Sequence, residues 1–135
     1  SYEPGTAVFP EGEVPPPLAR IDGTMVPAGN VVPMADFMKL TRFPIQVVWG
    51  DYIPSKPEAV NVGPRLTLDN RRINVERATL MVAAINRHGG RATNIMLPEI
   101  GITGNTHFPM MDLNNVRIAD LLSRFLADYK LDVRK

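Results

Sequence analysis

The second half of the chain alternates apolar runs with segments of helical periodicity. Residues 45–49 (IQVVW) form a short, nearly continuous apolar run that ends at Gly50 and Asp51. Such runs are typical of strands that are buried on both faces of a parallel sheet. Residues 92–97 (ATNIML) predict a second strand of the same kind.

Two helices are expected in this half. The first should run from about residue 70 to residue 88, and Gly89 and Gly90 should end it because glycine readily adopts the left-handed conformation found after helices. Its expected inner face consists of Val75, Thr79, Val82 and Ala83. The second helix should run from about residue 114 to residue 129. Its apolar stripe consists of Ile118, Leu122, Phe125, Leu126 and Tyr129.

The order strand, helix, strand, loop, helix predicts an α/β fold whose parallel strands are joined by a right-handed crossover. Two strands and two helices bury little apolar surface by themselves and leave strand edges unpaired. We therefore expect the C-terminal portion of a larger sheet, completed by an N-terminal part or by a second chain. A compact monomer built from these elements alone is the competing arrangement.

Proline dominates the first half. Of the 13 prolines, 11 lie at or before Pro64, so residues 4–44 can form neither a long helix nor a continuous sheet. Residues 15–17 (PPP) should be extended and exposed, and residues 36–40 predict a short helical turn.

We assign the chain to one domain, residues 1–135, with a Pro-rich region at 1–42 and the last strands and helices at 43–135. Residues 10–33 could form a cap over an active site, although ordinary packing is the commoner role for their apolar side chains. The side chains that would line such a cap are Val14, Leu18, Met25, Val31, Val32 and Met34.

Composition narrows the classes of function. A hydrophobic fraction of 44% and a charged fraction of 21% indicate a globular domain. The net charge of +1 gives no reason to expect nucleic acid or an anionic membrane surface as a partner. No apolar run reaches the length of a membrane span, and the first residues do not form a signal peptide. The chain has no cysteine, which excludes disulfides, thiolate metal sites and a cysteine nucleophile.

The sequence contains two histidines, His88 and His107. His88 ends the first predicted helix, where a polar or cationic side chain favours the negative end of the helix dipole, so a structural role is expected. His107 lies on a long loop after a buried strand, and sites in open α/β sheets form beyond the carboxyl ends of the strands. It could therefore be a general base, although a histidine that only hydrogen-bonds its loop fits the residue types equally well. We expect neither a metal nor a cofactor, because no second ligand stands at helical spacing from either histidine.

A histidine base needs a nucleophile and a carboxylate. The G-x-S-x-G nucleophile elbow is absent. Of the serines, Ser55 lies in a loop flanked by prolines and Ser123 lies within the last predicted helix, whereas Ser1 could be a nucleophile activated by its own α-amine. The candidate acids are Glu3, Asp51, Glu99 and Asp112.

Asp112 precedes a helix, where an N-cap is the favoured interpretation. The physical properties of the residues do not choose between Glu3, in the turn sequence YEPG, and Asp51, at the end of the first predicted strand.

Several segments of the chain resemble the C-terminal part of a subgroup of α/β-hydrolases, the secreted bacterial esterases with a Ser-His-Glu triad. The segments are 49–53 (WGDYI), 85–86 (IN), 89–90 (GG), 97–102 (LPEIGI), 104–108 (GNTHF), 112–115 (DLNN) and 118–120 (IAD). The resemblance covers most of the chain from about residue 43, and 104–108 followed by 112–115 is its most specific part. Residues 2–5 (YEPG) resemble the segment just after the strand that follows the nucleophile elbow.

The resemblance implies that His107 is the triad histidine and Glu3 the triad acid. Most α/β-hydrolases carry the acid after the next strand, in a Gly-x-x-Asp sequence, but here that position is Ile53. An isoleucine cannot orient an imidazole, which favours Glu3 and leaves Asp51 as the reserve acid. The serine and the oxyanion hole would lie outside this chain.

The resemblance also implies an extracellular or periplasmic protein that hydrolyses small-molecule esters. This chain would act with a partner chain or segment that carries the serine, as a heterodimer if proteolytic processing separates the two. The assembled enzyme could form a homo-oligomer. Phe108, Met110 and Met111, beside His107, could line the substrate pocket, although core filling is an equal alternative for the methionines.

Three functions thus remain open from the sequence. The first is a serine carboxylic ester hydrolase in which this chain supplies the histidine and the acid. The second is an N-terminal-nucleophile amidohydrolase that uses Ser1. The third is a non-catalytic binding or structural protein that keeps a hydrolase fold.

Overall fold

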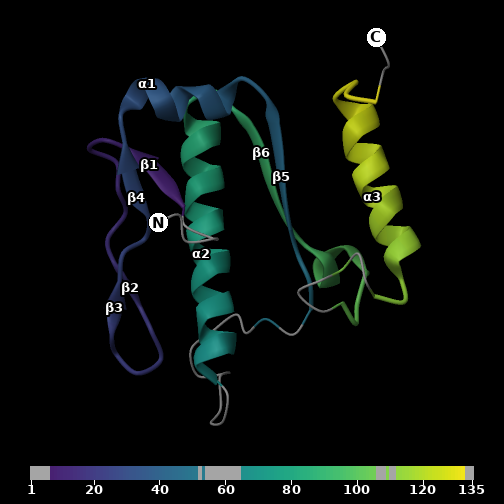
Figure 1. Ribbon diagram of the computed structural model, residues 1–135, viewed down its shortest axis with the longest axis horizontal. Coiled ribbons are helices and arrows are strands. Elements are labelled where there is room, and N and C mark those ends of the chain that lie inside the picture. The colour runs from purple at the N-terminus through teal and green to yellow at the C-terminus, as the bar shows by residue number, and fades with distance from the viewer. Residues whose placement is uncertain (1–6, 52, 54–64, 106–108, 110–111, 133–135) are drawn as a thin grey trace. The chain divides into compact units, whose positions relative to one another are not determined.

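The computed structural model describes most of the chain as short strands and three helices (Figure 1). The described residues are 7–51, 53, 65–105, 109 and 112–132. They belong to two compact units. The first unit comprises Ser1–Ile45 and Ile53–Thr93, and the second comprises Gln46–Tyr52 and Asn94–Lys135.

The Pro-rich part of the first unit contains only short strands, as the prolines predict. Strand β1 (Val8–Pro10) pairs in parallel with β4 (Asn30–Val32), and β2 (Leu18–Ala19) pairs antiparallel with β3 (Met25–Val26). Residues 15–17 lie in neither a helix nor a strand.

Two local features shape these strands. Gly29 lies so close to β1 that a Cβ atom would overlap the carbonyl oxygen of Ala7, so this position requires glycine. In the turn between β2 and β3, the hydroxyl and the backbone N–H of Thr24 both donate to the carboxylate of Asp22. These bonds lower the pKa of Asp22 below its ordinary value, because they stabilise the charged form.

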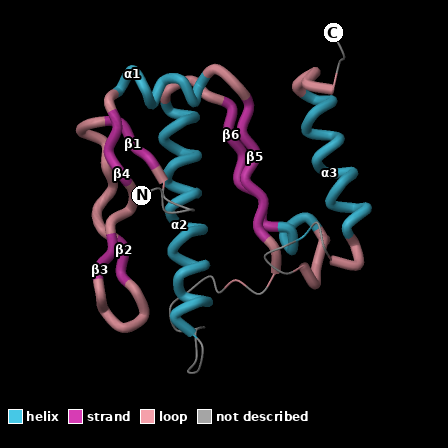
Figure 2. Tube along the Cα trace, viewed as in Figure 1, coloured by secondary structure: helices cyan, strands magenta, loops and turns pink. Residues whose placement is uncertain are grey.

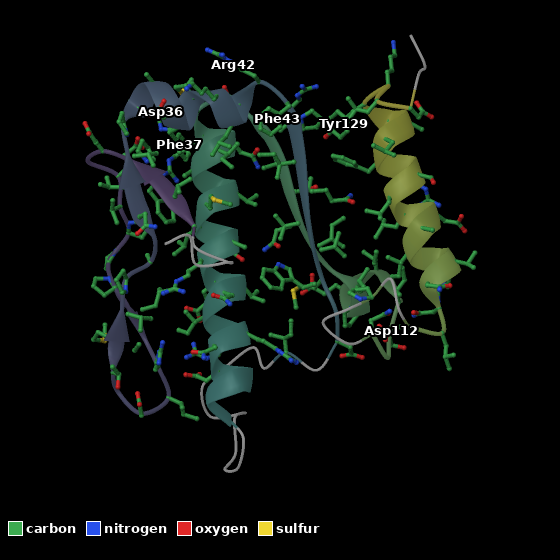
Figure 3. The ribbon with its side chains drawn as sticks, viewed as in Figure 1. Asp36, Phe37, Arg42, Phe43, Asp112 and Tyr129 are labelled. Atoms are coloured by element: carbon green, nitrogen blue, oxygen red, sulfur yellow. The ribbon has the colours of Figure 1, made fainter. Side chains whose placement is uncertain are left out.

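A short helical segment follows β4, as predicted for residues 36–40. Helix α1 (Met34–Phe37) continues into the 3₁₀ helix η1 (Met38–Thr41). Phe37 is fully buried and points from α1 toward the end of α2 (Figure 3).

Helix α2 (Arg65–Arg87) is the longest element. The predicted start near residue 70 was wrong by about a turn, since Pro64, which stands before the helix in the sequence, is a start signal that hydrophobic periodicity does not include. The predicted end is confirmed. Gly89 has a φ of 88°, its N–H donates to Asn86 O and the N–H of Gly90 donates to Ile85 O, which is the Schellman arrangement.

The buried face of α2 differs from the prediction. Its buried side chains are Asp69, Arg72, Ile73, Ala78, Val82, Ala84 and Ile85. Thr79 and Ala83, which we placed on the inner face, are exposed, and the hydroxyl of Thr79 bonds to Val75 O within the helix. Val82 is buried as predicted and Val75 is half-buried. The buried Asp69 and Arg72 were missed because a pattern of apolar positions does not detect charged residues.

Arg72 and Asp69 join α2 to the β2–β3 hairpin. Arg72 is 3% exposed and Asp69 is 0% exposed, and the Arg72 Nε donates to Asp69 Oδ1 over 2.9 Å. The other guanidinium nitrogens donate to Glu76 Oε1 and to the carbonyl of Ala19, while Asp69 Oδ2 accepts the backbone N–H of Ile21. This network satisfies both buried charges at once.

We expect Arg72→Ala to lower the free energy of unfolding by about 3–5 kcal/mol, because it leaves the carboxylate of Asp69 buried without its cation. Urea unfolding of the intact protein measures the change. The control is Lys39→Ala, which removes an exposed ion pair with Asp36 and should cost less than about 1 kcal/mol. Equal effects of the two substitutions would contradict this account of the network.

Strands β5 (Pro44–Trp49) and β6 (Arg91–Met96) form a two-stranded sheet, and their arrows point the same way (Figure 1). Figure 2 shows the two strands side by side. Both strands were predicted, to within one residue at each end. All six residues of β5 are half-buried rather than buried, and β6 is the strand that pairs with β5 in the described part of the chain.

The second unit continues from β6 into the 3₁₀ helix η3 (Leu97–Ile100) and ends with helix α3 (Asn115–Asp128). Helix α3 matches the prediction to within one residue at each end. Of the side chains predicted for its apolar stripe, Ile118 is buried, Leu122, Phe125 and Tyr129 are half-buried, and Leu126 is 40% exposed. Leu97, Ile102 and Ile118 form the buried core of this unit, and Val48, Ile95 and Leu121 pack against it. The core thus anchors η3 and the loop after it between the ends of the strands and α3.

Candidate functional site

Some of the predicted site residues belong to the described part of the chain and others do not. Glu3, His107, Phe108, Met110 and Met111 lie outside the described residues, as do Ser1 and Ser55, so their roles stay predictions. Of the residues near His107 in the sequence, Gly104, Asn105 and Pro109 are described, and so are Asp51 and Asp112. The geometry of the site is therefore that of Asp51, Gly104, Asn105, Asp112 and Asn114.

Gly104 and Asn105 are hydrogen-bonded to Asp51, which lies two residues after the end of β5. The backbone N–H of Asp51 donates to the carbonyl of Asn105 over 2.7 Å, and Asp51 Oδ2 accepts the N–H of Gly104 over 3.0 Å. Gly104 has a φ of 82°, a backbone conformation that side chains disfavour. The structure thus joins Asp51, the reserve acid, to Asn105, which precedes His107 by two positions in the sequence.

Side-chain hydrogen bonds join Asn105 to Asp112 and Asn114. Asn105 is fully buried, and its Nδ2 donates to Asp112 Oδ2 over 3.1 Å and to Asn114 Oδ1 over 2.6 Å. Asn114 Nδ2 donates back to Asn105 Oδ1 over 2.8 Å. Figure 3 shows Asp112 on the loop before α3.

The N-cap prediction for Asp112 was wrong. Asn114 is the N-cap of α3, and Asp112 lies two residues earlier, with its carboxylate on Asn105 and its carbonyl accepting the N–H of Asn115. Residues 113 and 114 form a turn after Asp112, so the helix begins later than the acidic residue.

The usual acid position and one further candidate acid have no part in this network. Ile53, at the usual acid position, is a half-buried residue in a loop. Glu99 lies in η3 and is exposed.

His88 takes part in a contact that sequence reasoning missed. It caps the end of α2, as predicted, and its Nε2 lies 2.8 Å from Glu13 Oε2, with Arg87 3.8 Å from the same carboxylate. The ring of Phe37 meets the imidazole edge-on at 5.6 Å. A carboxylate–imidazole pair is one part of a catalytic triad, but the only described serine, Ser123, belongs to the other unit, and the pair joins the loop after β1 to α2.

The apolar side chains proposed for a cap are mostly exposed. Ordinary packing was favoured for them, yet Val14, Met25, Val31 and Met34 are between 38% and 56% exposed, and only Leu18 and Val32 are half-buried. Among the described residues these four therefore do not contribute to a core.

A cavity of about 400 Å³ lies in the second unit, beside α3. Its lining consists of Ile95, Ile100, Ile102, Leu121, Arg117, Asp120 and Arg124. None of these residues was predicted to belong to the site. Within the described ranges, no group of His, Asp or Glu side chains could hold a metal ion, and no helix is long and apolar enough to cross a membrane.

Comparison with known proteins relates the chain to one class of enzyme. A solved structure of a novel bacterial esterase has a TM-score of 0.55 and 29% sequence identity to this chain, and the match covers 92% of this chain and 30% of that one. The chain therefore spans about 30% of the length of that esterase, and its fold is similar to a part of an esterase fold. No protein-family profile and no curated protein sequence matches it.

Proposed function

We propose that this chain is the C-terminal part of a serine carboxylic ester hydrolase of the α/β-hydrolase fold, and that it supplies His107 and Glu3 to the catalytic triad. The similarity to a bacterial esterase over 92% of the chain carries the proposal. The nucleophilic serine lies outside these 135 residues, on a preceding segment or a second chain with a G-x-S-x-G sequence.

Two features of the strands support a larger sheet. The apolar side chains of β5 are only half-buried, although their sequence is typical of a strand buried on both faces. In addition, Gln46 Oε1, on β5, is buried and accepts no hydrogen bond within the described part of the chain. A buried acceptor without a donor is costly, so a donor from the rest of the sheet is the expected partner.

In this proposal His107 takes the proton from the serine hydroxyl as the serine attacks the ester carbonyl, and it returns the proton to the leaving alcohol. Glu3 accepts the other ring N–H, which fixes the tautomer and stabilises the imidazolium. Backbone N–H groups outside this chain hold the developing oxyanion.

Glu3 is preferred to Asp51 as the acid because one carboxylate oxygen of Asp51 already accepts a bond from Gly104. Ile53 leaves the usual acid position without a carboxylate. The hydrogen bonds of Asp51 to Gly104 and Asn105 thus support a structural role for it rather than a place in the triad.

The first test is hydrolysis by the intact gene product that contains these residues. It should cleave p-nitrophenyl acetate and lose this activity on treatment with a fluorophosphonate. If the intact product cleaves no p-nitrophenyl ester from acetate to octanoate, the non-catalytic hypothesis replaces this one.

The amidohydrolase alternative, with Ser1 as the nucleophile, is tested on the printed 135-residue chain. Hydrolysis of an anilide by this chain that stops when the α-amine is acetylated would support it. No observation on the described residues favours this alternative, and Ser1 lies outside them.

A further inference from the structure

We infer that Asp51 and Asn105 are positioning residues for His107. Asp51 binds Gly104 and Asn105, Asn105 binds Asp112 and Asn114, and these hydrogen bonds set the place of the histidine. This inference rests on the proposed function, because the two residues act on catalysis only through His107. It assigns Asp51 a role other than that of the reserve acid.

Asp51 makes two hydrogen bonds to adjacent residues, one as donor and one as acceptor. Its backbone N–H donates to Asn105 O over 2.7 Å, and its carboxylate accepts the N–H of Gly104 over 3.0 Å. Two bonds to adjacent residues fix both the position and the orientation of a backbone, whereas one bond leaves it free to rotate. The backbone of Gly104 and Asn105 is therefore fixed in both position and orientation.

Asn105 is joined through its side chain to Asp112 and Asn114. Its amide is fully buried and uses both its nitrogen and its oxygen, in bonds of 2.6 and 2.8 Å with Asn114 and 3.1 Å with Asp112. These bonds join residues seven and nine positions apart in the sequence. Asn105 and Asp112, which precede and follow residues 106–111 in the sequence, are thus joined directly.

The side chain of Asn114 pairs with Asn105 instead of capping α3. An asparagine at the N-cap usually accepts a hydrogen bond from an N–H of the first helical turn. Within the described chain the side chain of Asn114 makes no such bond, and its oxygen accepts from Asn105 instead. The N-terminus of α3 lacks its side-chain cap, and the loop gains a buried, reciprocal amide pair.

Asp51 can be tested because its two possible roles respond differently to a neutral amide. Asparagine keeps an oxygen that accepts the N–H of Gly104, whereas alanine does not. As a positioning residue, Asp51→Asn should keep kcat within about threefold and Asp51→Ala should lower kcat about 10²-fold with little change in KM, because small misplacement of a catalytic group costs that much. The pH profile of kcat/KM should be the same in both variants. Equal large losses in the two variants, or no loss in Asp51→Ala, would overturn the inference for Asp51.

Asn105 is tested by exchanging donor and acceptor. Asn105→Asp places a carboxylate against Asp112, removes the donor to Asn114 Oδ1 and should lower kcat about 10²-fold. Adding Asp112→Asn should restore at least a tenth of the original kcat. The amide at 112 then donates to the carboxylate at 105, while the bond to Asn114 Oδ1 stays lost. Asp112→Asn alone is the matched control. A double variant as slow as Asn105→Asp, with an unchanged melting temperature, would contradict the pairing as the cause.

Hydrogen exchange of the intact protein separates this inference from the proposed function. The peptide that begins at Gly104 and ends at Leu113 should exchange at least 10-fold faster in Asn105→Ala and in Asp51→Ala, while the α2 peptides stay unchanged. Unchanged exchange in this peptide overturns the inference even in an active esterase. Faster exchange in a protein without esterase activity would leave the fixed loop standing and refute only the proposed function.

Discussion

Replacing His107 with alanine should lower kcat/KM for p-nitrophenyl acetate by at least about 10³-fold, since no other group would then take the proton from the serine. The substitution leaves the hydrogen bonds of Asp51 and Asn105 unchanged, so the fold should persist. Steady-state kinetics of the intact gene product, together with its melting temperature, measure both effects.

The matched control is His88→Ala. It removes the only other histidine, whose imidazole pairs with Glu13 in the other unit. This variant should keep kcat within about twofold and lose less than about 1 kcal/mol of stability, because both partners are partly exposed. Full activity in His107→Ala, or loss of activity only in His88→Ala, would refute the assignment of the catalytic histidine.

Glu3→Gln should lower kcat by about 10³–10⁴-fold, because a neutral amide cannot stabilise the imidazolium and can favour the wrong tautomer of the histidine. The same kinetic assay on the intact protein measures the loss. Asp51→Asn makes the same change of charge to amide at the reserve acid and serves as the control.

The two substitutions decide between the acids. A large loss in Glu3→Gln with a small loss in Asp51→Asn supports Glu3. The reverse result would place the acid at Asp51 and require its contact with Gly104 to change when substrate binds.

Local signals in the sequence predicted the regular elements well. Helix α3 has apolar side chains at helical spacing, and Gly89 and Gly90 mark the end of α2. The two ends of α3 and the end of α2 were therefore predicted to within one residue. The start of α2 was missed because the apolar pattern is weaker there than the signal from Pro64.

Contacts between distant residues were not predicted. The bonds of Arg72 to Ala19 and of His88 to Glu13 join residues that are 53 and 75 positions apart, and they involve polar groups without a spacing rule. The same is true of the site. The resemblance drew attention to Asn105 and Asp112 only as part of a motif. The hydrogen bonds of Asn105 to Asp112 and Asn114 join residues seven and nine positions apart, and no spacing rule predicts them.

The location of the nucleophile tests the central claim most directly. The intact gene product, with any chain that copurifies, is labelled with a fluorophosphonate, digested, and mapped by tandem mass spectrometry. The account predicts a single labelled serine within a G-x-S-x-G sequence outside residues 1–135, and no label when the printed chain is treated alone. A label on Ser1, Ser55 or Ser123, or no label on an intact protein that hydrolyses esters, would contradict it.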